Sequence, residues 1–197
     1  MKKCFLIIFI TIFSFSSIYA QEEESLKGEF YLAPDFSLML GTINNIEVSP
    51  AFGYHITDKF SIAAGFKYEF YSNTRLYSYQ QTVKTHIYGP RAFARFTFFK
   101  NLGDFLPIGM NTGLFAHAEF ESSSLEKKYF IYATNPDNGR FWYSTVLVGG
   151  GISQTASERV QVNVLILWDT NGGNISLYSN PVIRFGFQFF LRPVRQE

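Results

Sequence analysis

The chain has 197 residues, a formal net charge of +1 and 19% aromatic residues, yet its mean hydropathy is only +0.01. After Ala20 no apolar run approaches about 18 residues, so the sequence excludes a helical membrane protein. The balanced charge forms no basic patch or stripe, which excludes a nucleic-acid partner.

The first 20 residues are predicted to be a secretory signal peptide that is cleaved after Ala20. Lys2 and Lys3 supply the basic start, an apolar run follows, and Ala20 is the small residue that signal peptidase requires. A retained N-terminal anchor is the alternative. The only cysteine, Cys4, lies inside this segment, so the mature protein is expected to have no disulfide and no thiolate metal site. Residues 21–27 are predicted to be a mobile, charged lead-in.

Beyond residue 27, apolar and polar residues alternate with a period of two, which predicts β-strands. Each predicted strand has one apolar face and one polar face. The sixth strand is the weakest, because the run "VGGG" interrupts its alternation. In chain order the eight strands are Gly28 to Gly41, Ile46 to Thr57, Phe60 to Tyr71, Thr85 to Phe99, Phe105 to Glu121, Phe141 to Gln154, Val160 to Asp169 and Pro181 to Arg192.

These strands are long for a water-soluble protein. They have about 10 to 17 residues, whereas ordinary strands have about five or six. A tilted strand needs about 9 to 11 residues to cross a bilayer. Short connections near Asp58, Gly103 and Glu158 alternate with mostly longer ones, such as Ser72 to Lys84 and Ser122 to Arg140. Short turns at one end and longer loops at the other are typical of transmembrane barrels.

The predicted fold is therefore an all-β, eight-stranded, antiparallel up-and-down transmembrane β-barrel. It covers residues 28–192, and a C-terminal tail of residues 193–197 follows. Five prolines fall within or beside the predicted strands, and each removes a ladder hydrogen bond, so bulges or strand ends are expected there. These prolines are Pro34, Pro50, Pro90, Pro107 and Pro181.

The last strand, "PVIRFGFQFFLR", predicts which face meets the lipid. Ile183, Phe185 and Phe187 alternate with Arg184 and Gln188. A closed barrel satisfies all backbone hydrogen bonds inside the sheet, as hydrocarbon demands, and its outer face is apolar. The apolar face is therefore expected to meet lipid, and Arg184 and Gln188 are expected to face the interior.

This pattern resembles the small eight-stranded outer-membrane barrels of Gram-negative bacteria, the OmpA/OmpX-like group. The resemblance covers nearly all of the mature chain and implies an outer-membrane location, export by the signal peptide and a monomer. It also implies contact with outer-membrane lipid, lipopolysaccharide and the barrel-assembly machinery. The strand-end assembly signal of the group matches Arg184, Gly186, Phe189 and Leu191, although this chain continues through "RPVRQE". No peptidoglycan-binding domain is expected after the barrel.

The polar faces of the strands predict a charged interior. An eight-stranded barrel is just wide enough for side chains to fill, and buried charges must pair. A side-chain network that plugs the lumen is therefore expected, and a narrow ion path is the alternative. The predicted members are Glu47, Lys67, Glu69, Arg91, Arg95, Glu119 and Arg184.

The predicted role is structural or interactive at the cell surface, without enzymatic activity, cofactor or metal. Tyrosine-rich segments after the third and fifth strands are expected to extend those strands above the membrane. One alternative is a lipid-modifying hydrolase that uses His117, Glu119 and a nearby serine, such as one of Ser122 to Ser124. A second alternative is a secreted, lipocalin-like binder of an apolar ligand, which would have its greasy face inside.

Overall fold

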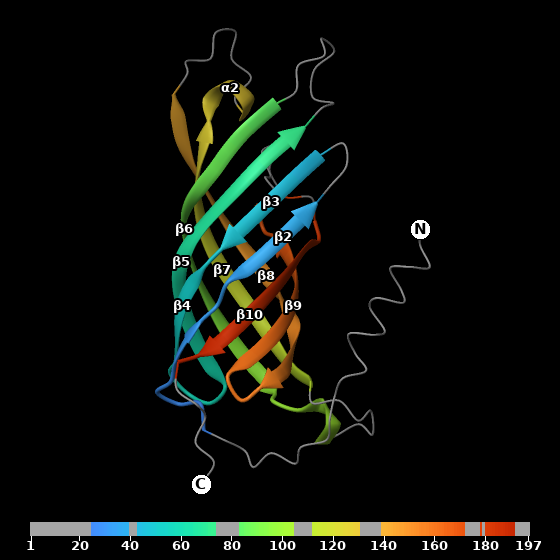
Figure 1. Ribbon diagram of the computed structural model, residues 1–197. Helices are drawn as coiled ribbons and strands as arrows, with labels where there is room; N and C mark the ends of the chain where they lie inside the picture. Colours follow the sequence, from blue (N-terminus) through green and yellow to red (C-terminus); the bar gives the residue numbers. More distant parts are fainter. Residues whose placement is uncertain are drawn as a thin grey trace, which may run out of the picture.

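Ten strands of the computed structural model form one closed antiparallel sheet (Figure 1). The structure describes residues 25–39, 43–73, 83–104, 112–130, 139–171, 178 and 180–191. The predicted signal peptide and the tail after residue 192 lie outside these residues. The strands are β1 (Phe30–Leu32), β2 (Asp35–Met39), β3 (Ile43–Ser49), β4 (Ala51–His55), β5 (Phe60–Asn73), β6 (Val83–Phe99), β7 (Thr112–Glu126), β8 (Arg140–Ser157), β9 (Val160–Asp169) and β10 (Val182–Phe190).

The ten strands occupy eight strand positions around the barrel. β1 and β2 follow one another along one edge of β10, and β4 and β3 follow one another along one edge of β5. β1 pairs with β4, and β2 pairs with β3. Strands β5 to β10 each pair with the next, so the ring closes from β10 onto β1 and β2. The eight-stranded, antiparallel up-and-down barrel predicted from the sequence is therefore confirmed.

Prolines cause the two interruptions. Pro34 separates β1 from β2, and Pro50 separates β3 from β4, because proline has no N–H to donate to the ladder. Their carbonyl groups still join the sheet: Pro34 O accepts from Phe187 N at 3.0 Å, and Pro50 O accepts from Phe66 N at 3.0 Å. Pro90 behaves differently, since β6 continues through it.

Only the seventh predicted strand, Val160 to Asp169, has the observed bounds. β7 runs on through the serine run to Glu126, in line with the expected extension of the fifth strand, while the expected start at Phe105 lies outside the described residues. β8 is the longest strand, although its alternation is the weakest. Gly151 leaves room for the ring of Phe115, because a Cβ at this position would lie only 2.7 Å from that ring.

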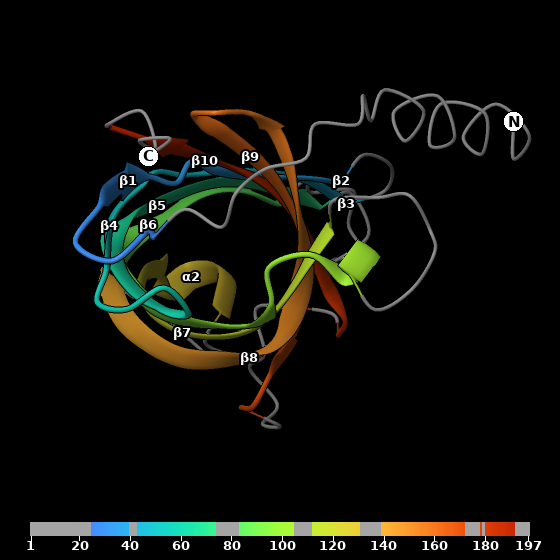
Figure 2. The same ribbon diagram turned by 90° about the horizontal axis from the view of Figure 1, so that it is seen from below.

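The two ends of the barrel differ. The connection between β4 and β5 and the one between β8 and β9 are short, and they lie at the lower end in Figure 1 together with β10's last residues. β6, β7 and β8 rise furthest at the opposite end, where the short helix α2 (Lys127–Phe130) follows β7. Seen along the barrel, α2 projects inside the ring of strands (Figure 2). None of the helices in the described part of the chain is long and apolar enough to span a membrane.

Burial is inverted relative to a soluble protein. In β10, Phe185 is 52% exposed while Arg184 is 0% exposed. The same alternation holds around the ring, so large apolar side chains cover the outside and charged side chains are buried inside. The outward set includes Phe30, Leu32, Phe36, Leu38, Ile46, Phe52, Ile62, Phe66, Phe96, Phe120, Ile166, Trp168 and Phe187. This arrangement suits a barrel surrounded by hydrocarbon and contradicts the lipocalin-like alternative, which needs an apolar interior.

Candidate functional site: the charged lumen

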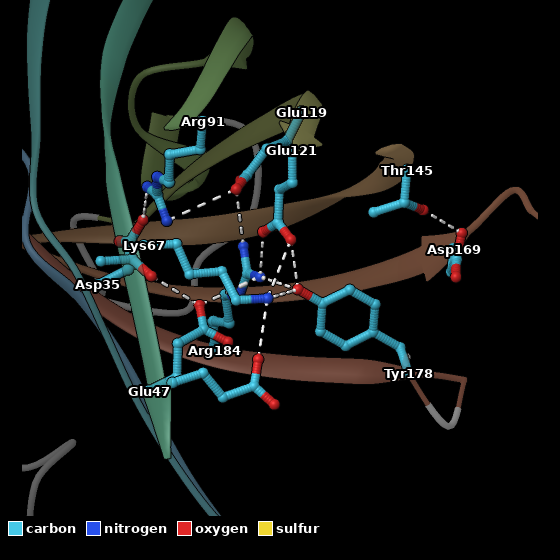
Figure 3. Close-up of polar contacts among 12 residues, drawn as sticks. Asp35, Glu47, Lys67, Arg91, Glu119, Glu121, Thr145, Asp169, Tyr178 and Arg184 are labelled. Carbon is cyan, nitrogen blue, oxygen red and sulfur yellow. Dashed lines mark hydrogen bonds and ion pairs between the residues drawn. The ribbon is translucent and has the colours of Figure 1, made fainter. Parts of the chain in front are cut away.

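Arg184 on β10 is the centre of a group of ion pairs inside the barrel (Figure 3). Its Nη1 lies 3.0 Å from Glu119 Oε1, and its Nη2 lies 2.6 Å from Glu121 Oε1 and 3.2 Å from Glu47 Oε1. Glu119 and Glu121 come from β7, and Glu47 comes from β3. One guanidinium thus joins three strands across the lumen.

Two further cations complete this group. Arg91 of β6 pairs with Asp35 of β2, and its Nη1 lies 3.6 Å from Glu119 Oε1. Lys67 Nζ of β5 lies 3.0 Å from Glu69 Oε2 and 3.1 Å from Glu121 Oε2. Together these eight side chains form the lumen network, which consists of Asp35, Glu47, Lys67, Glu69, Arg91, Glu119, Glu121 and Arg184.

The lumen network has five carboxylates and only three cations, and all eight side chains are buried. Neutral donors supply further hydrogen bonds. The Ser49 hydroxyl donates to Glu47 Oε1 at 2.7 Å, and Asn45 Nδ2 donates to Glu69 Oε1 at 2.8 Å. Because buried carboxylates are costly unless they are paired or hydrogen-bonded, these donors are part of the electrostatic balance.

Tyr178 caps the lumen network from the connection that precedes β10. Its hydroxyl group contacts Lys67 Nζ and Glu121 Oε2, and it accepts from Arg184 Nη2 at 3.2 Å. Lys67 Nζ also lies 4.6 Å from the centre of the Tyr178 ring. The alternation of the sequence does not identify Tyr178, because this residue lies outside the predicted strands.

Arg95 stands apart from the other predicted members. It lies opposite His117 of β7, two residues before Glu119 on that strand. No carboxylate of the described residues lies within ion-pair distance of Arg95. Its guanidinium carbon lies 4.9 Å from the centres of the Phe93 and Phe115 rings instead. The prediction that Arg95 serves the carboxylates was wrong, because the register places its head group between two aromatic rings, which attract a cation through their π faces.

His117 links Arg95 to the lumen network. Arg95 Nε lies 3.2 Å from His117 Nδ1, and His117 Nε2 lies 2.9 Å from Glu119 Oε2. A guanidinium can only donate, so Nδ1 accepts and Nε2 carries the hydrogen that is donated to Glu119. Both ring nitrogens are therefore occupied, and no serine in the described part of the chain is hydrogen-bonded to His117.

The polar chain continues to the lower end of the barrel. Arg95 Nη1 lies 3.4 Å from Gln188 Oε1, and Gln188 Nε2 lies 3.0 Å from His55 Nε2. Arginine side chains stay protonated in proteins, so Arg95 and Arg184 cannot relay a proton along this chain. The described residues also contain no group of three or more His, Cys, Asp or Glu placed to hold a metal ion.

The predicted assembly signal divides between the two faces of β10. Arg184 and Gly186 point into the lumen, and a Cβ on Gly186 would lie 2.0 Å from Asp35 Oδ1. Phe189 and Leu191 point outward and are 38% and 50% exposed. The inward pair thus packs against the lumen network, while the outward pair belongs to the apolar surface.

Comparisons with solved structures return small transmembrane barrels. A chain from a study titled "De novo design of transmembrane beta-barrels" matches at 12% identity and a TM-score of 0.48, over 86% of this chain and 100% of its own. The N-terminal β-barrel domain of Pseudomonas aeruginosa OprF matches at 11% identity and a TM-score of 0.48, over 83% of this chain and 98% of its own. The E. coli Outer Membrane Protein W matches at 13% identity and a TM-score of 0.46, over 83% and 98% respectively.

No protein-family model matches the chain, and no curated protein sequence does. The fold itself rests on the hydrogen-bonded ring and on the inverted burial of its side chains. On these grounds the chain is a transmembrane β-barrel with a buried network of charges in its lumen.

Proposed function

We propose that this chain is a monomeric outer-membrane protein whose role is structural or interactive at the cell surface, without enzymatic activity. One observation carries the proposal: ion pairs centred on Arg184 tie β3 and β7 to β10 in the lumen, while the outside is apolar. A barrel built in this way presents a rigid wall to lipid and leaves its upper end free for contacts.

The lumen network supports a plugged interior. Arg91, Lys67 and Arg184 are at most 2% exposed, so they fill the centre of the barrel. Open channels require about 16 strands or more. Two apolar clusters occupy other parts of the interior. One consists of Tyr31, Ala33, Ala51, Ala63, Phe93 and Phe190, and the other of Phe115, Leu147, Leu165 and Leu167.

The proposal includes export by a signal peptide and insertion by the barrel-assembly machinery. The basic and apolar first 20 residues support secretion with a cleaved signal peptide. The spacing of Arg184, Gly186, Phe189 and Leu191 in the last strand supports recognition by the barrel-assembly machinery. The apolar outer surface supports contact with outer-membrane lipid and lipopolysaccharide.

A lipid-modifying hydrolase is the second candidate, and the 2.9 Å contact between His117 and Glu119 is the observation in its favour. The hydrogen bond from Arg95 to the other ring nitrogen argues against it, because a catalytic histidine needs one nitrogen for its nucleophile. Replacing His117 by Ala and analysing the membrane lipids tests this candidate. Unchanged lipid composition is expected.

Membrane fractionation tests the main proposal. The protein is expected in the outer-membrane fraction, with an electrophoretic mobility that shifts on boiling. Its mass should be that of a mature chain that begins at Gln21. Recovery in the soluble periplasmic fraction without a mobility shift would contradict it. Planar-bilayer recordings of the purified barrel should show no steady conductance, since the lumen is filled.

A further inference from the structure

A groove of about 600 Å³ lies on the outside of the barrel across β5, β6 and β7. Its floor is made of alanines that face one another on neighbouring strands: Ala64 lies opposite Ala92, and Ala94 lies opposite Ala118. Phe52 continues the first of these rows on one side and Phe120 continues it on the other, so aromatic rings form both walls. The groove is apolar and within the size range of ligand pockets, which is about 300–1,000 Å³.

The character of the same surface changes toward the upper end. Two residues above the groove, the outward side chains are Ser122 and Ser144, whose hydroxyl oxygens lie 3.3 Å apart. Two residues higher, Tyr88, Ser124 and Trp142 lie side by side on β6, β7 and β8. The hydroxyl groups and aromatic rings thus lie within about 13 Å of the apolar groove along the strand, because the four residues between them rise about 3.3 Å each.

Arg140 lies above this aromatic level. Its guanidinium carbon lies 4.6 Å from the centre of the Tyr88 ring, and Nη2 donates to the carbonyl groups of His86 at 2.7 Å and Ser124 at 2.6 Å. A further hydrogen bond from Nε to Ser124 Oγ at 2.8 Å and the ring stacking fix the plane of the guanidinium. Nε and Nη2 are therefore engaged, and Nη1 is the nitrogen that can offer a phosphate a charge-assisted hydrogen bond.

Among the described residues, the rim around Arg140 carries more cations than carboxylates. Glu126 Oε1 lies 3.4 Å from Arg140 Nη1, and Glu126 Oε2 lies 3.0 Å from Lys128 Nζ. One carboxylate therefore serves two cations. Lys84 adds a further exposed cation on the outward face of β6, two residues above His86.

We infer that this surface binds one phosphorylated glycolipid of the outer leaflet, with an acyl chain in the alanine groove and a head-group phosphate at Arg140. The inference rests on the proposed function, because it needs the barrel in an outer membrane with its long strands facing outward. The order of apolar groove, hydroxyl groups, aromatic rings and cations matches the order of chain, sugar and phosphate in such a lipid.

A second copy of the chain fits this surface poorly. In a membrane, a two-fold dimer axis runs along the membrane normal, so equal levels of the two barrels meet. Arg140 of one copy would then face Arg140 of the other, and the excess charges of the two rims would repel. A lipid phosphate is negatively charged, so it is attracted to the rim instead of being repelled by it.

Native mass spectrometry of the full-length barrel in detergent provides the test. The probes are diphosphoryl lipid A and the same lipid without its phosphates. Arg140→Gln is expected to weaken binding of the phosphorylated probe by about tenfold, the cost of a lost charge-assisted hydrogen bond, and to leave the other probe unaffected. Ala92→Phe, which fills the groove, is expected to weaken both.

Arg159→Gln removes an exposed cation at the lower end, and Ile166→Phe enlarges an outward side chain away from the groove. Equal binding by Arg140→Gln and Arg159→Gln would overturn the inference, as would a protein dimer that Ala92→Phe dissociates. Wild-type protein that fractionates to the outer membrane yet binds no probe defeats this inference alone, whereas failure to reach that membrane defeats the proposed function.

Discussion

Arg184 and Glu121 are 63 residues apart in sequence, yet Arg184 Nη2 donates to Glu121 Oε1 at 2.6 Å across the lumen. Neither side chain is exposed, and the pair connects the last strand of the barrel to β7. Burying two charges is costly, so their contact is stabilising only while both partners remain in place.

Replacing Arg184 by Met is expected to destabilise the barrel by about 3–5 kcal/mol, because Glu47, Glu119 and Glu121 lose their common cation. Urea unfolding of the detergent-solubilised or lipid-reconstituted protein measures this loss. Arg159→Met is the control, since that side chain lies exposed in the turn before β9 and should change stability by no more than about 0.5 kcal/mol. Equal losses in the two variants would show that the lumen network is not a stabilising unit.

Arg95→Met is expected to cost less than Arg184→Met, about 1–3 kcal/mol. The substitution removes the contacts with two aromatic rings and leaves His117 Nδ1 without its donor, but no carboxylate loses an ion pair. The same unfolding experiment ranks the two variants. A larger loss for Arg95→Met would mean that its charge is coupled to the carboxylates after all.

Tyr178→Phe keeps the ring against Lys67 and removes only the hydroxyl group. A loss of about 1–3 kcal/mol is expected, because Lys67, Glu121 and Arg184 all contact that oxygen. Tyr54→Phe on the outward face is the matched control and should be nearly neutral. If the two changes have equal effects, the connection before β10 does not contribute to the lumen network.

Acid is expected to release the segment before β1. Slight burial raises the pKa of the Asp58 carboxyl, but hydrogen bonds from the Ser25 hydroxyl and from the amides of Lys27 and Leu26 outweigh this effect and hold the pKa below its ordinary value of 3.8. A lowered folded-state pKa means that the unfolded chain binds the proton more readily. The stabilisation is therefore present above about pH 4 and lost as the pH falls through the folded-state pKa.

Hydrogen exchange measures this release. The Leu26 and Lys27 amides should be protected at pH 6, with protection factors that fall at pH 3, because protonated Asp58 is a weaker acceptor. Asp58→Ala should lower the protection at pH 6 and remove most of its pH dependence. Protection that is unchanged in Asp58→Ala would show that other contacts hold this segment.

The eight strand positions of the barrel could be predicted from the sequence because side chains alternate strictly between the two faces of a strand. In β10 this rule placed Arg184 and Gln188 inside and Phe185 outside, as the structure does. The rule fails where polarity does not alternate. Ser122 to Ser124 are polar at consecutive positions, so alternation placed the end of the strand at Glu121, whereas β7 runs on to Glu126.

Partners across the lumen could not be predicted in the same way. Which cation meets which carboxylate depends on the stagger of strands around the ring, and alternation along one strand carries no information about that stagger. Arg91 and Arg95 lie on the same face of β6, yet the first pairs with Asp35 and the second lies between aromatic rings. Tyr178 contributes from the connection between β9 and β10, outside the alternating strands.

The position of Arg184 in β10 links barrel closure to charge neutralisation. Glu47 of β3 and the two β7 carboxylates precede it in the chain, so their common cation is the last to be synthesised. Until β10 pairs with β1 and β2, these three acids face an open, incompletely compensated cavity. β10 thus both closes the ring and supplies the counter-ion, so the same step that removes these acids from water also neutralises them.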